Sequence, residues 1–118
     1  MEVRGLRVEH EGDPPVVVLR IVGRIDPLDL PFVEEAGKNL ISGGEKRFVV
    51  DLSETEYISS TGVGLLLYYQ HVLSQKGGCL KLTAPFGSVQ RTFETTKLDD
   101  IFDIHATREE AVAAAQKC

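Results

Sequence analysis

The chain has 118 residues, of which 42% are apolar and 26% charged, and its net charge is −5. That length accommodates one compact domain with its own core, so we expect a single domain over residues 1–118. The negative charge and the scattered lysines and arginines argue against a nucleic-acid surface, because neutralising phosphates requires clustered cations.

The cysteines and the N-terminal segment indicate the compartment. Cys79 begins an apolar run and Cys118 is the last residue, a spacing that does not indicate a disulfide framework. We expect Cys79 to be a buried, reduced core residue and Cys118 a loose terminal thiol, as in a reducing cytosol. Residues 1–4 include an acid, and no long apolar segment follows, so we expect neither a signal peptide nor a transmembrane helix. The predicted location is cytoplasmic.

The first part of the chain predicts a hairpin and a helix. Residues 3–10 predict an edge strand, which a turn rich in proline follows. The β-branched run at residues 16–22 predicts a central strand paired with the first. Residues 23–27 break that strand. Apolar residues at three-to-four-residue spacing up to Ile41 then predict an amphipathic helix that Asp29 caps.

The rest of the chain alternates strands and helices. Residues 48–52 predict a strand buried on both faces, as in a parallel sheet, and residues 61–75 predict a helix. The remaining elements are a strand over residues 79–84, a helix containing Val89 and Phe93, a short strand near residues 103–105, and a final helix over residues 111–115 with a capping box at Thr107 and Glu110. This order predicts an α/β domain with a mixed, mainly parallel sheet of four to five strands and about four helices.

The motifs of several catalytic and nucleotide-binding sites are missing. Gly62 and Gly64 follow a strand, but the spacing matches neither a phosphate-binding P-loop nor a GxGxxG dinucleotide fingerprint. The histidines lack metal-ligand spacing, and no GxSxG nucleophile elbow is present. Asp51 ends a strand, but the other acidic and basic groups of a phosphoacceptor receiver domain are not evident, so we predict that it orients the next loop. We expect no catalysis by this chain alone and no cofactor or metal.

Ser59, Ser60 and Thr61, which we call the hydroxyl corner, directly precede an apolar helical segment. A hydroxyl at a helix start can cap an unpaired backbone N–H, or it can carry a phosphate beside the positive end of the helix dipole. Spacing alone favours capping. Gly62 and Gly64 weigh against capping alone, since each costs about 1 kcal/mol relative to alanine within a helix. They would let a docking protein approach the backbone closely.

Four segments match the motifs of one bacterial family in the right order. Residues 57–64 are similar to Y-M-D-S-S/T-G-L-G, and residues 23–26 to G-x-I/L-D. Residues 77–82 resemble G-G-x-L-x-L, and residues 96–104 resemble T-G-L-x-x-I-F-x-I with Lys97 in place of the glycine. Over nearly its whole length the chain therefore resembles the anti-sigma factor antagonists, which are STAS-domain proteins. The resemblance implies a STAS-like fold.

The resemblance also implies a phosphorylation switch. In this family the unphosphorylated antagonist binds an anti-sigma factor that is also a serine kinase, and thereby frees the sigma factor. Phosphorylation of a hydroxyl at the helix start breaks the binding, and a phosphatase restores it. The resemblance places the phosphoacceptor at Ser60, then Thr61, with Ser59 third. The partner-binding residues that we infer are Asp26, Arg24, Gly62, Val63 and Gly64.

One departure from the signature leaves alternatives open. Ser59 stands where the family has an aspartate, so a negative charge is missing beside the site. One alternative is that kinase recognition is altered. The other is that the domain binds a partner without being phosphorylated, either in a signalling assembly or in a transport system that brings it to a membrane. A nucleotide or small-anion sensor at the same helix start is a further alternative. Asp26 is equally explained as a turn residue before Pro27.

Overall fold

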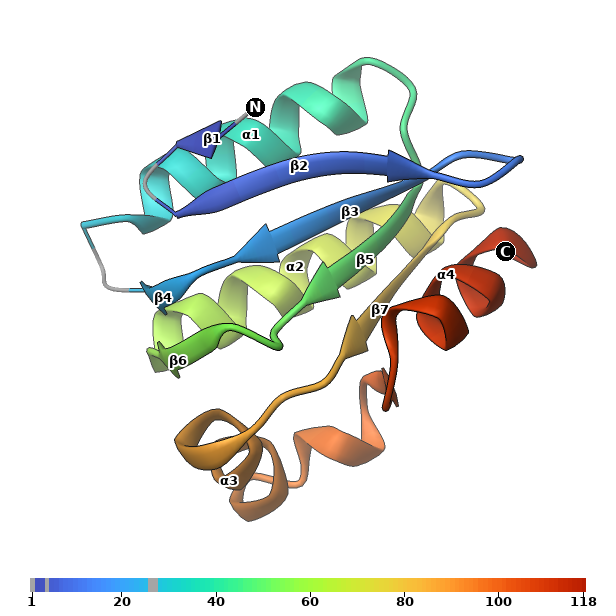
Figure 1. The fold of residues 1–118 in the computed structure, drawn as a ribbon. Helices are drawn as coiled ribbons and strands as arrows, with labels where there is room; N and C mark the ends of the chain where they lie inside the picture. Colours follow the sequence, from blue (N-terminus) through green and yellow to red (C-terminus); the bar gives the residue numbers. More distant parts are fainter. Residues whose placement is uncertain (1, 4, 26–27) are drawn as a thin grey trace.

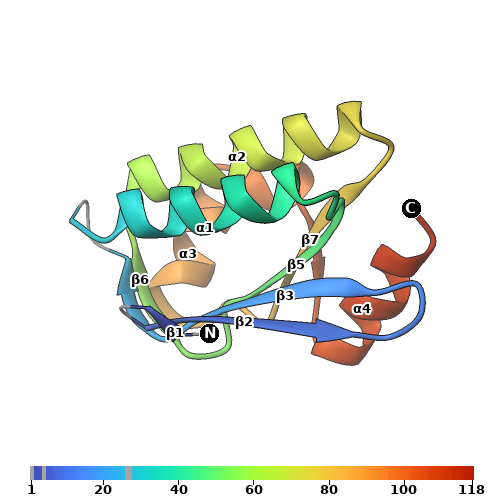
Figure 2. The same cartoon turned by 90° about the horizontal axis from the view of Figure 1, so that it is seen from above.

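The computed structural model describes residues 2–3, 5–25 and 28–118, and it shows a six-stranded main sheet with helices on both faces (Figures 1 and 2). The strands of the main sheet are β1 (Glu2–Val3), β2 (Leu6–Glu11), β3 (Val16–Ile21), β5 (Arg47–Asp51), β7 (Cys79–Thr83) and β8 (Asp103–His105). The helices are α1 (Leu30–Ser42), α2 (Ser60–Gln75), α3 (Gly87–Thr95) and α4 (Arg108–Gln116), with a short 3₁₀ turn, η1 (Leu98–Asp100), before β8.

The main sheet has the order β1-β2-β3-β5-β7-β8. β2 pairs antiparallel with β1 and β3, whereas β3, β5, β7 and β8 are parallel to one another. The prediction of a mixed, mainly parallel sheet is therefore confirmed, and its five longer strands are those that the sequence indicated. The apolar runs at residues 16–18 and 48–50 are wholly buried because helices cover both faces of the strands that carry them.

The helices divide into two layers (Figure 2). α1, α2 and α3 bury large apolar side chains against one face of the sheet, among them Leu66, Leu73 and Phe93. α4 alone covers part of the other face, where Ala111, Val112 and Ala115 meet valines of β3 and β5. Within the described ranges, no helix combines the length and the apolar character needed to cross a membrane.

Two short strands are absent from the sequence prediction. β4 (Gly23–Ile25) and β6 (Thr55–Ile58) form a separate two-stranded parallel sheet. Residues 23–25 therefore begin a second pairing, although the sequence prediction treated them only as a break. Gly23 has φ +88, a left-handed conformation that turns the chain out of β3. The Thr55 hydroxyl ties β6 to the end of β3 by donating a hydrogen bond to the carbonyl oxygen of Ile21 at 2.7 Å.

The N-terminal strand also differs from its prediction. Val3 lies in β1, which pairs antiparallel with β2, so β2 is an inner strand of the sheet. The predicted single edge strand is thus divided. Gly5, with φ +81, makes the turn between the two parts, and an added side-chain carbon there would lie 2.5 Å from the Val22 carbonyl oxygen.

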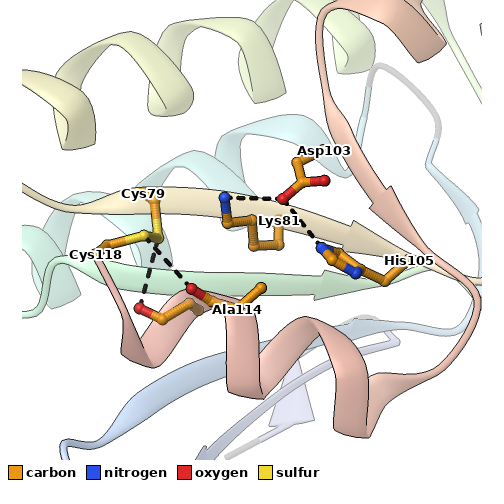
Figure 3. Close-up of a disulfide and its surroundings, with 7 residues drawn as sticks. Cys79, Lys81, Asp103, His105, Ala114 and Cys118 are labelled. Atoms are coloured by element: carbon orange, nitrogen blue, oxygen red, sulfur yellow. Dashed lines mark hydrogen bonds and ion pairs between the residues drawn. A yellow bond between two sulfur atoms is a disulfide. The ribbon is translucent and has the colours of Figure 1, made fainter.

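The prediction for the cysteines is wrong. Cys79 and Cys118 form a disulfide, with their Cα atoms 6.0 Å apart despite a sequence separation of 39 residues (Figure 3). α4 packs across β7, and this brings the last residue beside the first residue of that strand. Spacing along the chain cannot indicate this proximity, because it depends on how the final helix docks on the sheet.

Candidate functional site

The hydroxyl corner lies where β6 passes directly into α2. Ser59 is the N-cap of α2, with an extended backbone, and its Oγ accepts a hydrogen bond from the Gly62 N–H at 3.1 Å. The Ser59 side chain is nearly buried, whereas Ser60 and Thr61 are exposed. The corner therefore divides two tasks: Ser59 caps the helix, and its neighbours present hydroxyls to solvent.

The cap explains how the corner retains its geometry without an aspartate. Serine and aspartate are both strong N-cap residues, because each places an oxygen where it can accept from a first-turn N–H. Ser59 therefore preserves the hydrogen bond while removing a negative charge. The structure makes Ser59 the least accessible of the three predicted phosphoacceptors.

The three residues after the corner differ in exposure. A side-chain carbon on Gly62 would lie 2.9 Å from Cγ1 of Ile58, so close packing accounts for this glycine. Val63 is only 6% exposed and belongs to the core, which leaves its side chain no surface to offer a partner. Gly64 is exposed, and apart from its chain neighbours and the backbone of α2, no atom of the described residues lies within 4 Å of where its side chain would begin. Packing therefore does not account for Gly64.

The small sheet places an aromatic and a cationic side chain beside the corner. Arg24 in β4 is paired with Tyr57 in β6, two residues before Ser59. The guanidinium carbon of Arg24 lies 4.4 Å from the Tyr57 ring centroid, within cation–π range, and Tyr57 is 37% exposed. The sequence prediction named Arg24 but assigned no role to Tyr57. Asp26, the other residue predicted there, lies outside the described residues.

The start of α3 borders the same strand. The Ser88 hydroxyl donates to the carbonyl oxygen of Glu56 at 2.9 Å, which ties the first turn of α3 to β6. Phe86, the N-cap residue of α3, is 44% exposed. Phe86 was not among the residues predicted from the sequence. Its only local signal is a large apolar residue between a proline and a glycine, in a segment that turns.

Asp51 supports the loop that leads into β6. It is buried at the end of β5, and its Oδ1 accepts a hydrogen bond from the Ser53 N–H at 2.9 Å. The prediction that Asp51 orients the following loop is confirmed. This contact is of the Asx-turn type, in which a short acidic side chain fixes its own backbone two residues later.

The electrostatics of the corner favour an added anion. The first turn of α2, which the structure describes in full, contains no acidic side chain. The helix dipole and the first-turn N–H groups therefore act on whatever group Ser60 or Thr61 carries. A groove of about 380 Å³ lies elsewhere, between α1 and α2, and is lined by none of the three corner residues. The corner is thus an exposed surface distinct from that groove.

Comparison with known proteins gives consistent matches. The STAS domain family model matches residues 7–111. The anti-sigma-B factor antagonist of Bacillus subtilis (strain 168) is 31% identical over 104 residues, which are 88% of this chain and 92% of that protein.

Two solved structures share the fold. An anti-sigma factor antagonist from Mycobacterium paratuberculosis has a TM-score of 0.80 at 24% identity and covers 94% of each chain. The Bacillus cell fate determinant SpoIIAA, solved in its phosphorylated form, has a TM-score of 0.73 at 23% identity over 92% of this chain and 97% of that one. At these identities the structural likeness establishes the fold alone.

Proposed function

Because this chain belongs to the STAS-domain family, we propose that it is an anti-sigma factor antagonist, a cytoplasmic regulatory protein with no catalytic activity of its own. The observation that carries the proposal is the division of tasks at the hydroxyl corner. Ser59 caps α2, which leaves Ser60 and Thr61 exposed at the helix start. The 31% identical antagonist of Bacillus subtilis supports the same function.

In the proposed cycle, the partner is an anti-sigma factor with serine-kinase activity. It transfers the γ-phosphoryl group of ATP to the hydroxyl of Ser60, or else of Thr61, and releases ADP. A phosphate adds about −1.5 to −2 charges and three acceptor oxygens, which the start of α2 stabilises. The added charge and bulk then weaken the partner complex, and a phosphatase removes the phosphate by hydrolysis.

The surface proposed to bind the partner includes Gly64, Tyr57 and Arg24. At Gly64 the surface of α2 carries no side chain, although the packing around this position would admit one. Glycine within a helix costs about 1 kcal/mol relative to alanine. Close approach of a partner to the helix backbone explains why glycine occupies this position despite that cost. The exposed Tyr57 ring adds apolar contact area next to Ser60. Asp26, from the same family motif as Arg24, remains a proposed member of the surface.

Phosphate mapping tests the switch. The tagged chain is recovered from its native cell with whatever binds it, incubated with ATP and mapped by mass spectrometry. We expect phosphate at Ser60, or at Thr61 when Ser60→Ala blocks the first site. Ser53→Ala is the matched control, because Ser53 is an exposed serine in the loop before β6. Phosphate found only outside residues 59–61 would refute the proposed switch.

Partner binding gives a second, independent readout. Ser60→Asp places a negative charge at the corner, so it is expected to weaken partner capture at least tenfold, whereas Ser53→Asp leaves it unchanged. Equal capture by both variants would indicate a binding module without a phosphorylation switch. Gly64→Leu should also weaken capture, because its side chain would project from an exposed position where no other part of the described structure crowds it.

A further inference from the structure

α4 is held on the sheet by little apolar surface. Ala111, Val112 and Ala115 are its buried side chains, and two of these three contribute a single methyl group. Hydrophobic stabilisation scales with the apolar area removed from water, so alanines supply much less of it than leucines do. Contacts at the two ends of α4 therefore add to this modest apolar packing.

The two ends are fixed by different chemistry. At the N-terminal end, Arg108 forms ion pairs with Glu11 at 2.6 Å and with Glu9 at 3.3 Å, both on β2. At the C-terminal end, the disulfide joins Cys118 to Cys79 on β7. The ion pairs can break and re-form without any chemical change. The disulfide, in contrast, exists only while the cysteines are oxidised.

The surroundings of the disulfide decide whether a reagent can reach it. Cys79 and Cys118 are both only partly buried, and the bond lies at the outer end of α4 (Figure 3). The Cys79 sulfur lies 3.7 Å from the Ala115 carbonyl oxygen, and the Cys118 sulfur lies 3.9 Å from that of Ala114. The disulfide therefore lies against the last turn of the helix. A thiolate has to reach a disulfide sulfur before exchange can take place, and neither cysteine is fully buried.

We propose that Cys79 and Cys118 form a thiol–disulfide exchange site that controls how firmly the C-terminal half of α4 docks on the sheet. A small thiol opens the site: its thiolate attacks one sulfur, the S–S bond breaks, and the departing cysteine thiolate takes a proton. A second thiol resolves the mixed disulfide. The products are two cysteine thiols and one small-molecule disulfide, and oxidation by such a disulfide reverses the sequence.

Opening the bond changes one face of the molecule. Without it, the Arg108 ion pairs still hold the start of α4, while the last turn retains a hydrogen bond from the Gln116 side chain to the Pro14 carbonyl oxygen at 3.3 Å. The last turn then opens more often and uncovers the apolar side chains beneath it, including Val16 and Val49. The hydroxyl corner begins the helix on the opposite face, so the exchange site acts on a separate surface.

Hydrogen exchange by mass spectrometry tests the proposal on the full chain. Oxidised protein is compared with protein reduced by dithiothreitol. We expect amides in residues 111–118 to exchange about tenfold faster or more after reduction, while those in α2 change little. Cys118→Ser should match the reduced protein and show no response to dithiothreitol. Unchanged exchange in α4, or equal acceleration throughout the chain, would overturn a local clamp.

A redox titration tests reversibility. The chain is equilibrated in mixtures of reduced and oxidised glutathione, its free thiols are alkylated, and the intact mass is measured. We expect the disulfide and dithiol forms to interchange within the span of these mixtures, with two alkyl groups added to the reduced form. A disulfide that stays closed in every mixture, or that never forms, would overturn the proposal.

Discussion

α2 and α4 begin in the same way but are held on the sheet by different forces. Each starts at a capping hydroxyl, Ser59 or Thr107, that accepts a hydrogen bond from the N–H three residues later. α2 has 16 residues and buries Leu66, Tyr69 and Leu73 against the larger core, whereas α4 has nine and buries mainly alanine. The same start thus serves one helix that buries large apolar side chains and one that buries small ones and is also attached at both ends.

The larger core also contains a buried tyrosine whose hydroxyl is hydrogen-bonded to α1. The Tyr69 hydroxyl donates to the Glu34 carbonyl oxygen at 2.7 Å, and burial raises the pKa of Tyr69 well above its ordinary value. Gly37 permits this contact, since a side-chain carbon there would lie 2.5 Å from the tyrosine ring. The helix carrying the hydroxyl corner therefore packs on the larger core through bulky side chains, whereas α4 packs on the smaller cluster mainly through alanines.

Truncating a core side chain on each helix should give the largest difference. Leu73→Ala removes a fully buried side chain from α2 and is expected to lower the free energy of unfolding by about 3–4 kcal/mol. Val112→Ala on α4 removes less and should cost about 1–2 kcal/mol. Urea denaturation of the oxidised proteins measures both. Equal losses would show that α4 depends on apolar packing as much as α2 does.

The elements that could be predicted from sequence are those whose signals are local. The β-branched run at residues 16–18 and the apolar run at residues 48–50 indicate strands without reference to any partner, and the observed strands include both. The Thr107 cap is visible for the same reason: its hydrogen bond to the Glu110 N–H at 3.2 Å spans three residues. Local spacing is enough where the structure-forming contact is itself local.

What could not be predicted depends on contacts between distant segments. β4 is three residues long, and its strand character arises from pairing with β6 some thirty residues later. The same pairing places the Arg24 guanidinium against the Tyr57 ring, so this part of the candidate site could not be predicted from the sequence either. The disulfide is a stronger case, because Cys118 meets Cys79 only after α4 has docked. The hydroxyl corner itself was predictable, but the residue that caps it was not.

Removing each cap tests whether the two helix starts are equally important. Ser59→Ala is expected to cost about 1–2 kcal/mol, because it leaves the Gly62 N–H without its partner in a nearly buried position. Thr107→Ala should cost about 0.5–1 kcal/mol, since water can replace that exposed contact. Ser59→Asp restores an acceptor and should recover most of the loss. Urea denaturation curves provide the measurement, and a larger loss at Thr107 would contradict this order.

Acid should give the smallest effect, and it acts on the α4 side of the sheet. Hydrogen bonding from Arg108 holds the pKa of Glu9 below its ordinary value, and hydrogen bonding from Lys81, then from His105, does the same for the pKa of Asp103. A carboxyl whose pKa is lower in the folded state stabilises the fold above its unfolded pKa of about 4. That contribution is lost as the pH falls through the folded pKa.

Arg108→Gln isolates the part of this acid dependence that belongs to α4. The variant should be slightly less stable than the parent near neutral pH and should converge with it as the pH falls through the lowered pKa of Glu9. The difference is small because these carboxylates are partly exposed and solvent screens the ion pairs. Arg91→Gln, at an exposed position on α3, is the control. Thermal unfolding at low and high salt measures the stability difference between variant and parent, which salt should reduce. A difference that persists in acid and at high salt would mean that Arg108 holds α4 by packing rather than by charge.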